Sequence, residues 1–295
     1  MNNISFHTPV LLKETIELLN PQQNNNFIDC TLGGAGHTLS ILEKTAPLGK
    51  VLGIDASEES LRIISSYIKG RDLEKRLILV RDNFVNLRRI AEDNNFYEVN
   101  GVLFDLGLSS DLLEFSGRGF SFLRDEKLDM RFDDRADTPT AADLINSLKQ
   151  EQLADIFYHY GEERRSRRIA EAIVSARQKQ KIFTTGELVE IIKKASPIHS
   201  KINPATRVFQ AIRIAVNHEL DNLSSAIDQA IDILNKNGRL AIISYHSLED
   251  RIVKNKFRNN KSLKIINKKP IIPSRQEVVT NRRARSAKLR IVEKI

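Results

Sequence analysis

The sequence predicts an α/β fold built on a doubly wound, mostly parallel sheet that a helical segment interrupts. Four short apolar runs within the first 105 residues each end at a polar or glycine-rich turn, and the stretches between them have helical spacing. Runs that are apolar on both faces are typical of parallel strands covered by helices. The next run of similar quality begins more than 130 residues after the fourth ends, which is far more than one crossover helix needs.

The four expected strands cover residues 27–31, 51–55, 77–80 and 101–105. Between the second and third, Leu61, Ile64 and Ile68 recur at helical spacing and predict a helix that covers the sheet. Ligands bind beyond the carboxyl ends of the strands in such sheets. The expected site therefore consists of the residues that follow strand ends, namely residues 29–37, Asp55, Asn83 with Phe84, and residues 105–110.

The long interval after the fourth strand predicts a helical second domain at residues 115–216. Its expected helices cover residues 141–160, 163–180 and 184–195, the last opened by a capping box of Thr184 and Glu187, and a further helix begins at Asn203-Pro204. A helix at 217–237, stopped by Gly238, leads to a fifth strand at 239–245. A helix at 247–257 and closing strands at 263–268 and 287–294 follow. The predicted domains are 1–114, 115–216 and 217–295, with the first and last sharing one sheet.

Composition excludes several classes of protein. Charged residues make up 28% of the 295 residues, and no apolar run approaches the ~18 residues of a spanning helix, so we expect no membrane association. The single cysteine, Cys30, cannot form an internal disulfide or a cysteine-rich zinc site. Because the amino terminus also lacks the layout of a signal peptide, we expect a cytoplasmic protein without a metal site. The sequence leaves the oligomeric state open, a homodimer included.

The positive charge is concentrated at the carboxyl-terminal end. Residues 251–295 contain 15 Lys and Arg against 2 Asp and Glu, which leaves 31 basic and 36 acidic residues in the rest of the chain. Such a segment favours contact with a polyanion, because each neutralised phosphate releases counterions. The alternative is a solvated basic surface.

The segment 29–37 joins the first strand to the first helix and contains three glycines. Glycines let the backbone approach a ligand, and the amino end of a helix offers unpaired N–H groups. Asp55, which ends the second strand, is suited to accept the hydroxyls of a ribose. A dinucleotide is disfavoured because the third glycine of its motif is replaced by Leu39. The acidic Asp29 favours a cationic ligand such as S-adenosylmethionine, and the alternative is a tight turn without a ligand.

Asp105 follows the fourth strand, where the transferable group lies in such a sheet. The exocyclic amine of a base is a poor nucleophile until its lone pair is freed, so its methylation calls for a hydrogen-bond acceptor beside the methyl donor. Asp105 is the candidate for this role. The alternatives are that it caps a turn or only binds the cofactor.

Three further segments are weaker candidates. Residues 117–134 combine phenylalanines that can stack on bases with arginines that can hold phosphates, and the alternative is a hinge held by ion pairs. The run 162–168 is interpreted as a solvated helix start. His246 is interpreted as lining the site or structural rather than as part of a hydrolase triad, and His37 as shaping the cofactor pocket.

Taken together, these motifs resemble the RsmH (MraW) family of small-subunit ribosomal RNA methyltransferases, nearly from end to end. The segments that carry the resemblance are HTPVLLKE (7–14), DCTLGGAGHT (29–38), DLGLSS (105–110), RGFSF (118–122), LDMR (128–131), YGEE (160–163), NPATR (203–207), ISYHSLEDR (243–251) and RARSAKLR (283–290).

The resemblance implies a class I S-adenosylmethionine-dependent methyltransferase fold with a helical inserted domain for substrate recognition. It also implies transfer of methyl to the exocyclic N4 amine of a decoding-centre cytidine in 16S rRNA of the small ribosomal subunit. The family's cofactor contacts carry over to Ala35, Gly36, His37, Asp55, Phe84 and Asp105. The family usually has Gln where this chain has Leu112, so no side-chain contact is carried over there. The rival functions are a class I methyltransferase of another substrate and an RNA-binding assembly factor with a vestigial pocket.

Overall fold

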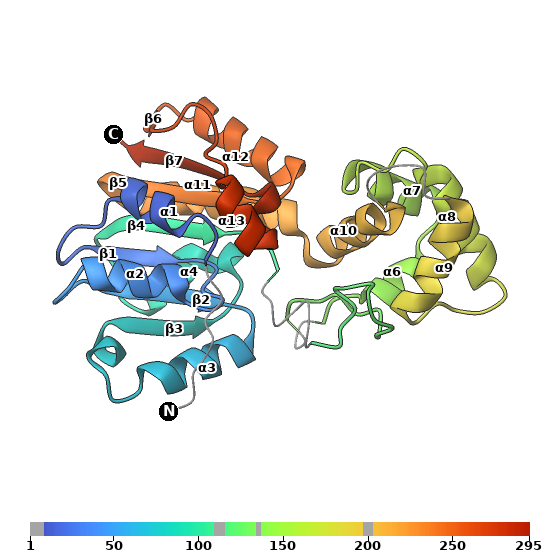
Figure 1. Cartoon of the computed structure of the whole chain (residues 1–295), viewed down its shortest axis with the longest axis horizontal. Coiled ribbons are helices and arrows are strands. Elements are labelled where there is room, and N and C mark those ends of the chain that lie inside the picture. Colours follow the sequence, from blue (N-terminus) through green and yellow to red (C-terminus); the bar gives the residue numbers. More distant parts are fainter. Residues whose placement is uncertain (1–8, 109–115, 134–136, 197–202) are drawn as a thin grey trace. The chain divides into compact units, whose positions relative to one another are not determined.

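The computed structural model describes residues 9–108, 116–133, 137–196 and 203–295 (Figure 1). Two compact units divide the chain, one formed by Met1–Gly107 with Leu220–Ile295 and the other by Leu108–Glu219. The second unit is continuous in sequence and separates the two parts of the first. The segment 115–216, in which the sequence predicts an inserted domain, falls within the second unit.

A seven-stranded sheet forms the centre of the first unit, in the order β3-β2-β1-β4-β5-β7-β6 (Figure 1). Strands β1 to β5 pair in parallel, and β7 is antiparallel to both β5 and β6. The order reverses between β1 and β4, which is where ligands bind in open sheets of this kind. The strands are β1 (Asn26–Asp29), β2 (Val51–Asp55), β3 (Leu77–Arg81), β4 (Val99–Asp105), β5 (Leu234–Ser244), β6 (Leu263–Ile265) and β7 (Lys288–Lys294).

Helices cover both faces of this sheet. Neighbouring strand residues point to opposite faces, so Ile28 and Phe104 belong to one apolar core while Phe27 and Leu103 belong to the other. The first core is covered by α4 (Leu87–Asp93), α11 (Glu219–Ile233) and α12 (Ser247–Asn259). The second is covered by α1 (Leu12–Leu19), α2 (Gly36–Lys44) and α3 (Glu58–Ile68). The predicted doubly wound architecture is confirmed.

Several predicted boundaries in the first unit are wrong. The helix predicted to end at Asn237 ends at Ile233, because the chain enters β5 at Leu234, which pairs with Val99 of β4. The last loop holds a short helix, α13 (Arg275–Thr280), and a 3-10 turn, η3 (Arg282–Ser286). Two other 3-10 turns are η1 (Asp72–Lys75) and η2 (Phe84–Asn86).

The second unit is helical around its own apolar core (Figure 1). The single helix predicted at 141–160 is two helices, because Leu148 and Lys149 are extended and the backbone N–H of Lys149 donates to Gln152 Oε1 at 3.0 Å. Thr184 and Asn203 cap the following helices as predicted. The helices are α6 (Ala141–Ser147), α7 (Gln150–His159), α8 (Ser166–Arg177), α9 (Thr185–Ala195) and α10 (Pro204–Asn217).

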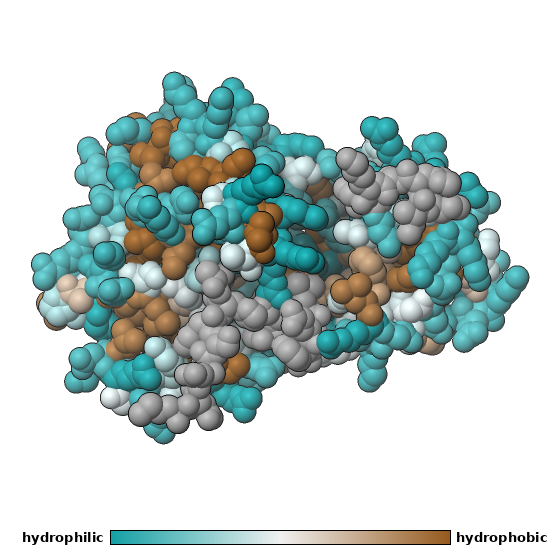
Figure 2. All heavy atoms as spheres, in the orientation of Figure 1, coloured by the Kyte–Doolittle hydropathy of each residue, from teal (hydrophilic) through white to brown (hydrophobic). Residues whose placement is uncertain are grey.

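Hydrophilic residues predominate on the face of the molecule shown in Figure 2, and apolar residues form separate patches among them. Among the described residues, no helix is both long enough and apolar enough to cross a membrane.

Candidate active site

The turn after β1 is organised by the buried carboxylate of Asp29, which is only 2% exposed. Its Oδ1 accepts the N–H of Thr31 at 3.1 Å, and its Oδ2 accepts the hydroxyl of Thr38 at 2.7 Å. Burial raises the pKa of Asp29 above its ordinary value. The carboxylate therefore ties the glycine loop to α2, and the proposal that Asp29 favours a cationic ligand stays a prediction.

Asp55, at the end of β2, holds the glycine loop from the other side. Its Oδ2 accepts the N–H of Gly33 at 2.7 Å, and its Oδ1 accepts the N–H of Ser57 at 2.8 Å. Gly33 has φ +48°, a left-handed conformation that glycine adopts without strain. A Cβ at Gly34 would meet no atom within 4 Å, so the loop backbone faces open space there.

The start of α2 places a histidine in a buried position. Gly36 lies against Pro9, and a Cβ at Gly36 would come within 2.2 Å of Pro9 Cγ. Ala35 is fully buried with φ +58°. His37 is 5% exposed, and neither of its ring nitrogens has a hydrogen-bond partner among the described residues. Buried polar atoms without a partner call for an explanation, and a bound ligand is one.

Asp105 lies at the carboxyl end of β4, beside the glycine loop. Its backbone N–H donates to Thr31 Oγ1 at 2.6 Å. Its Oδ1 accepts the hydroxyl of Tyr245 at 2.7 Å, while its Oδ2 lies 3.6 Å from Nε2 of His37, beyond hydrogen-bond distance. One carboxylate oxygen is thus fixed by the protein, and the other lies beside a buried imidazole.

Tyr245 follows β5 and was not expected at the site. Burial raises the pKa of Tyr245 well above its ordinary value, and the Asp105 carboxylate raises it further, so its hydroxyl keeps its proton and acts as a donor. Its ring packs on Gly107, which has φ +130° and where a Cβ would lie 3.0 Å from the ring. A glycine two residues after Asp105 is the sequence signal for this contact.

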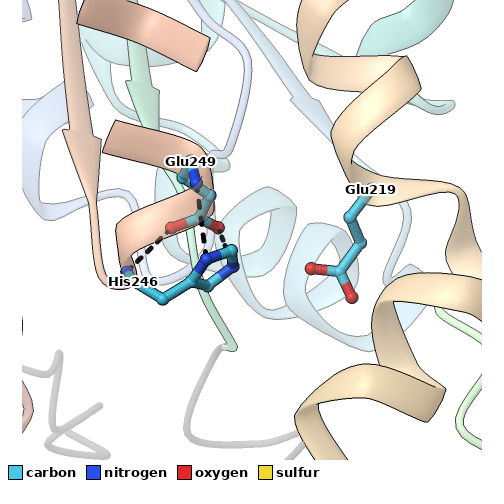
Figure 3. A group of neighbouring side chains, drawn as sticks. All are labelled: Glu219, His246 and Glu249. Atoms are coloured by element: carbon cyan, nitrogen blue, oxygen red, sulfur yellow. Dashed lines mark hydrogen bonds and ion pairs between the residues drawn. The ribbon is translucent and has the colours of Figure 1, made fainter. Parts of the chain in front are cut away.

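His246 and Glu249 form the cap of α12, and Figure 3 shows the two side chains together at the start of this helix. The backbone N–H groups of Tyr245 and His246 both donate to Glu249 Oε2, at 2.8 and 3.2 Å. Nε2 of His246 lies 3.1 Å from Glu249 Oε1. The structural interpretation of His246 is therefore confirmed, and the cap also fixes the backbone of Tyr245. Glu219, also drawn in Figure 3, pairs with Arg213 within the second unit.

Phe84 begins the short turn η2 after β3. Its ring is half-buried and meets the ring of Phe104 edge-on, with the centroids 5.6 Å apart. The turn is held by Asn83, whose Oδ1 accepts the N–H of Val85. Phe84 therefore lies at the carboxyl end of a strand, as predicted, and its described contacts are with the apolar core.

Comparison with known proteins decides the family. The sequence model of the MraW methylase family matches residues 4–295. Two relatives carry the name ribosomal RNA small subunit methyltransferase H: the chain is 47% identical to the one from Desulfotalea psychrophila over 100% of both chains, and 43% identical to the one from Magnetococcus marinus over 98% of both. The chain belongs to the MraW methylase family.

A solved structure agrees with the fold. A structure described as an rRNA-methylase from Clostridium thermocellum has a TM-score of 0.50 at 11% identity, over 98% of this chain and 99% of that one. The MraW family member described here thus has the predicted class I methyltransferase fold. It is a methyltransferase, with S-adenosylmethionine as its cofactor.

The residues present fit that cofactor. The exposed backbone at Gly34 gives a ligand room beside the loop, and the partnerless ring nitrogens of His37 are buried polar atoms that a ligand can satisfy. The Asp55 carboxylate lies beside the same loop, where it accepts the Gly33 and Ser57 N–H groups. Of the expected cofactor residues, Asp55 contacts the glycine loop at Gly33 and Asp105 contacts it at Thr31, while Ala35, Gly36 and His37 belong to the loop and the start of α2.

The family motifs in the second unit have structural roles. Phe120 is 7% exposed and stacks on Phe132, with the ring centroids 5.6 Å apart. Arg118 donates from Nη1 to the carbonyl oxygens of Arg131 and Phe132. The hypothesis that the phenylalanines of residues 117–134 stack on bases is therefore wrong for Phe120, because its ring is part of the core.

The arginine-rich run 162–168, which includes the first residues of α8, is a solvated helix start, as predicted. Its four arginines are exposed, whereas Glu163 is buried and pairs with Arg207 at 3.5 Å. The motif residues His7, Ser109 and Ser110, and the position of Leu112, lie outside the described residues.

Proposed function

We propose that this methyltransferase modifies the exocyclic N4 amine of a decoding-centre cytidine in 16S rRNA, within the small ribosomal subunit. The names of the relatives, ribosomal RNA small subunit methyltransferase H, support the substrate class. The observation that carries the proposal is that the two oxygens of the Asp105 carboxylate have different surroundings. Oδ1 is held by Tyr245, and Oδ2 is left to accept a hydrogen bond from a substrate.

Methylation of the N4 amine requires a hydrogen-bond acceptor such as Asp105 Oδ2 beside the methyl donor. The N4 lone pair of cytosine is delocalised into the ring, so an acceptor that holds one N–H turns the nitrogen toward the methyl donor. Asp105 Oδ2 is that acceptor. The reaction forms a nitrogen–carbon bond, breaks a sulfur–carbon bond and releases one proton from nitrogen, for which Oδ2 is the proposed acceptor.

The proposed cofactor residues are Ala35, Gly36, His37, Asp55, Phe84 and Asp105. Bound S-adenosylmethionine supplies an electrophilic methyl group on a sulfonium. Asp55 accepts the ribose hydroxyls, and the N–H groups at the start of α2 bind the carboxylate of the amino acid part. The buried imidazole of His37 closes the pocket on the side of Asp105.

The basic segment 251–295 supports a nucleic acid substrate. Some of its charges are paired within the protein, including Lys264 with Glu293 and Arg290 with Asp250. Others, such as Arg282 and Arg285, are exposed on η3. The exposed cations can neutralise phosphates of a structured RNA.

The test is methyl transfer from radiolabelled S-adenosylmethionine to small ribosomal subunits from a strain that lacks this gene, followed by nucleoside analysis. We expect labelled N4-methylcytidine. Label in another nucleoside would overturn the N4 assignment, and label in free cytidine would favour a small-molecule substrate. Subunit binding without thermal stabilisation by S-adenosylmethionine would favour an assembly factor with a vestigial pocket, because a ligand of the folded state must stabilise it.

A further inference from the structure

A surface cavity of about 320 Å³ lies in the first unit, and Tyr245 is one of its lining residues. Tyr245 connects this cavity to the candidate active site, because its hydroxyl also donates to Asp105. The other walls come from the start of α12, from the loop before α13 and from the segment that joins η3 to β7. The lining residues are Tyr245, His246, Ser247, Ile272, Pro273, Arg285, Ser286, Ala287 and Lys288.

The lining combines the groups that a nucleotide needs. Tyr245, Ile272 and Pro273 offer an aromatic ring and aliphatic surface, and Ile272 is 67% exposed although it is apolar. Arg285 and Lys288 offer two cations. The cavity is near the lower limit of the volumes that small-molecule sites usually have, about 300 Å³. It is therefore large enough for one nucleotide unit and its phosphate.

The charged side chains that line the cavity are the basic residues Arg285 and Lys288. Among the described residues, Arg285 has neither an ion pair nor a side-chain hydrogen bond, and it is exposed. Lys288 shares the carboxylate of Asp250 with Arg290, at 3.3 and 2.6 Å, so one acidic group faces two basic ones. Of the other nearby acids, Glu249 accepts the backbone N–H groups of Tyr245 and His246, Asp105 accepts the Tyr245 hydroxyl, and Glu277 accepts the N–H of Leu11.

We propose that this cavity binds a phosphodiester of the RNA strand next to the target nucleotide. Arg285 and Lys288 contact the phosphate, and Ile272, Pro273 and the Tyr245 ring contact the adjoining sugar or base. The proposal rests on the proposed function for the identity of the strand. It adds a second point of attachment that fixes the register of the RNA relative to Asp105.

The first test is equilibrium binding of a fluorescein-labelled single-stranded RNA decamer at several potassium chloride concentrations. Arg285→Gln should lower the slope of log affinity against log salt by about 0.7 and weaken binding about five-fold at 0.1 M salt, because one phosphate contact is lost. The matched control is Lys236→Gln, which removes one exposed charge at the opposite end of β5. Equal slopes for the two variants would overturn the proposal.

The second test separates binding from chemistry. With small ribosomal subunits as substrate, Arg285→Gln should raise KM about five-fold and leave kcat unchanged, and Arg285→Lys should restore most of the loss. A weakened affinity for S-adenosylmethionine in Arg285→Gln would assign the cavity to the cofactor and overturn the proposal. If the wild-type protein methylates no RNA, the proposed function fails, yet the salt slopes still decide whether this cavity binds a phosphodiester.

Discussion

The hydroxyl of Tyr245 donates to Oδ1 of Asp105 at 2.7 Å, which links the end of β5 to the end of β4. The pairing of the two strands prepares this contact, because Asp105 lies opposite Ile243, two residues before Tyr245. A neutral donor on one oxygen restricts rotation of the carboxylate and leaves Oδ2 toward His37. Tyr245 is thus a positioning residue for the carboxylate that we propose orients the amine.

Replacing Tyr245 by Phe should slow methyl transfer by about 10- to 100-fold, because a hydrogen bond to a charged group contributes about 1.5–3 kcal/mol. The ring still packs on Gly107, so the melting temperature should change little. We expect the dissociation constant of S-adenosylmethionine to stay within about two-fold of the wild-type value. Single-turnover kinetics measure the rate, and Tyr97→Phe, at a tyrosine that is 60% exposed, is the control. A rate equal to that of Tyr97→Phe would refute the positioning role.

Asp105→Ala tests the carboxylate itself. It removes the acceptor that we propose for the amine, and it should lower the rate of methyl transfer by about 10²- to 10⁴-fold. The affinity for S-adenosylmethionine should fall by much less. The two quantities are measured separately, by single-turnover kinetics and by calorimetry. If the rate falls only as far as the affinity does, Asp105 is a binding residue alone.

Asp55→Ala tests the ribose contact. The carboxylate accepts the Gly33 N–H and is proposed to accept the ribose hydroxyls, so its loss should weaken cofactor binding about 10- to 100-fold. Calorimetric titration with S-adenosylmethionine measures the change. Asp72→Ala, at an exposed acid of η1, is the matched control. An unchanged dissociation constant in Asp55→Ala would show that Asp55 only supports the loop.

The sequence predicts the sheet well because buried parallel strands need continuous apolar runs. Such runs can be recognised in the sequence without knowing which strands pair with one another. The end of α11 could not be predicted in this way. Leu234 pairs with Val99 of β4, and this contact joins residues that are far apart in the sequence. The break after α6 is local, but Lys149, which precedes α7, is not one of the usual N-cap residues.

Some residues of the candidate site can also be predicted from the sequence, whereas their contacts depend on the fold. The rule that ligands bind at strand ends directs attention to Asp55 and Asp105, which lie at the carboxyl ends of β2 and β4 as predicted. The sequence cannot show that Asp29 binds Thr31 and Thr38, because its partners depend on how the turn folds. The role of Tyr245 depends on the register between β4 and β5, which the sequence does not reveal.

The ion pair between Asp250 and Arg290 predicts how stability depends on pH. Burial alone would raise the pKa of Asp250, but hydrogen bonds and charge from Arg290 and Lys288 outweigh it, so its pKa lies below the ordinary value. A carboxyl group whose pKa is lower in the folded state stabilises the protein above its unfolded pKa, about 3.9. That stabilisation is lost as the pH falls below about 4 and through the folded pKa.

The expected result is a melting temperature that is lower for Asp250→Asn than for the wild type at pH 7, with the difference shrinking as the pH falls below about 4. Arg290 is 9% exposed, so loss of its charged partner leaves a nearly buried cation and should cost about 3 kcal/mol at neutral pH. Differential scanning calorimetry from pH 7 to pH 3 measures the difference. Asp72→Asn, at an exposed carboxylate, controls for the general effect of acid. A difference that stays constant over this range would contradict the linkage, since the pair would then stabilise the fold without its charge.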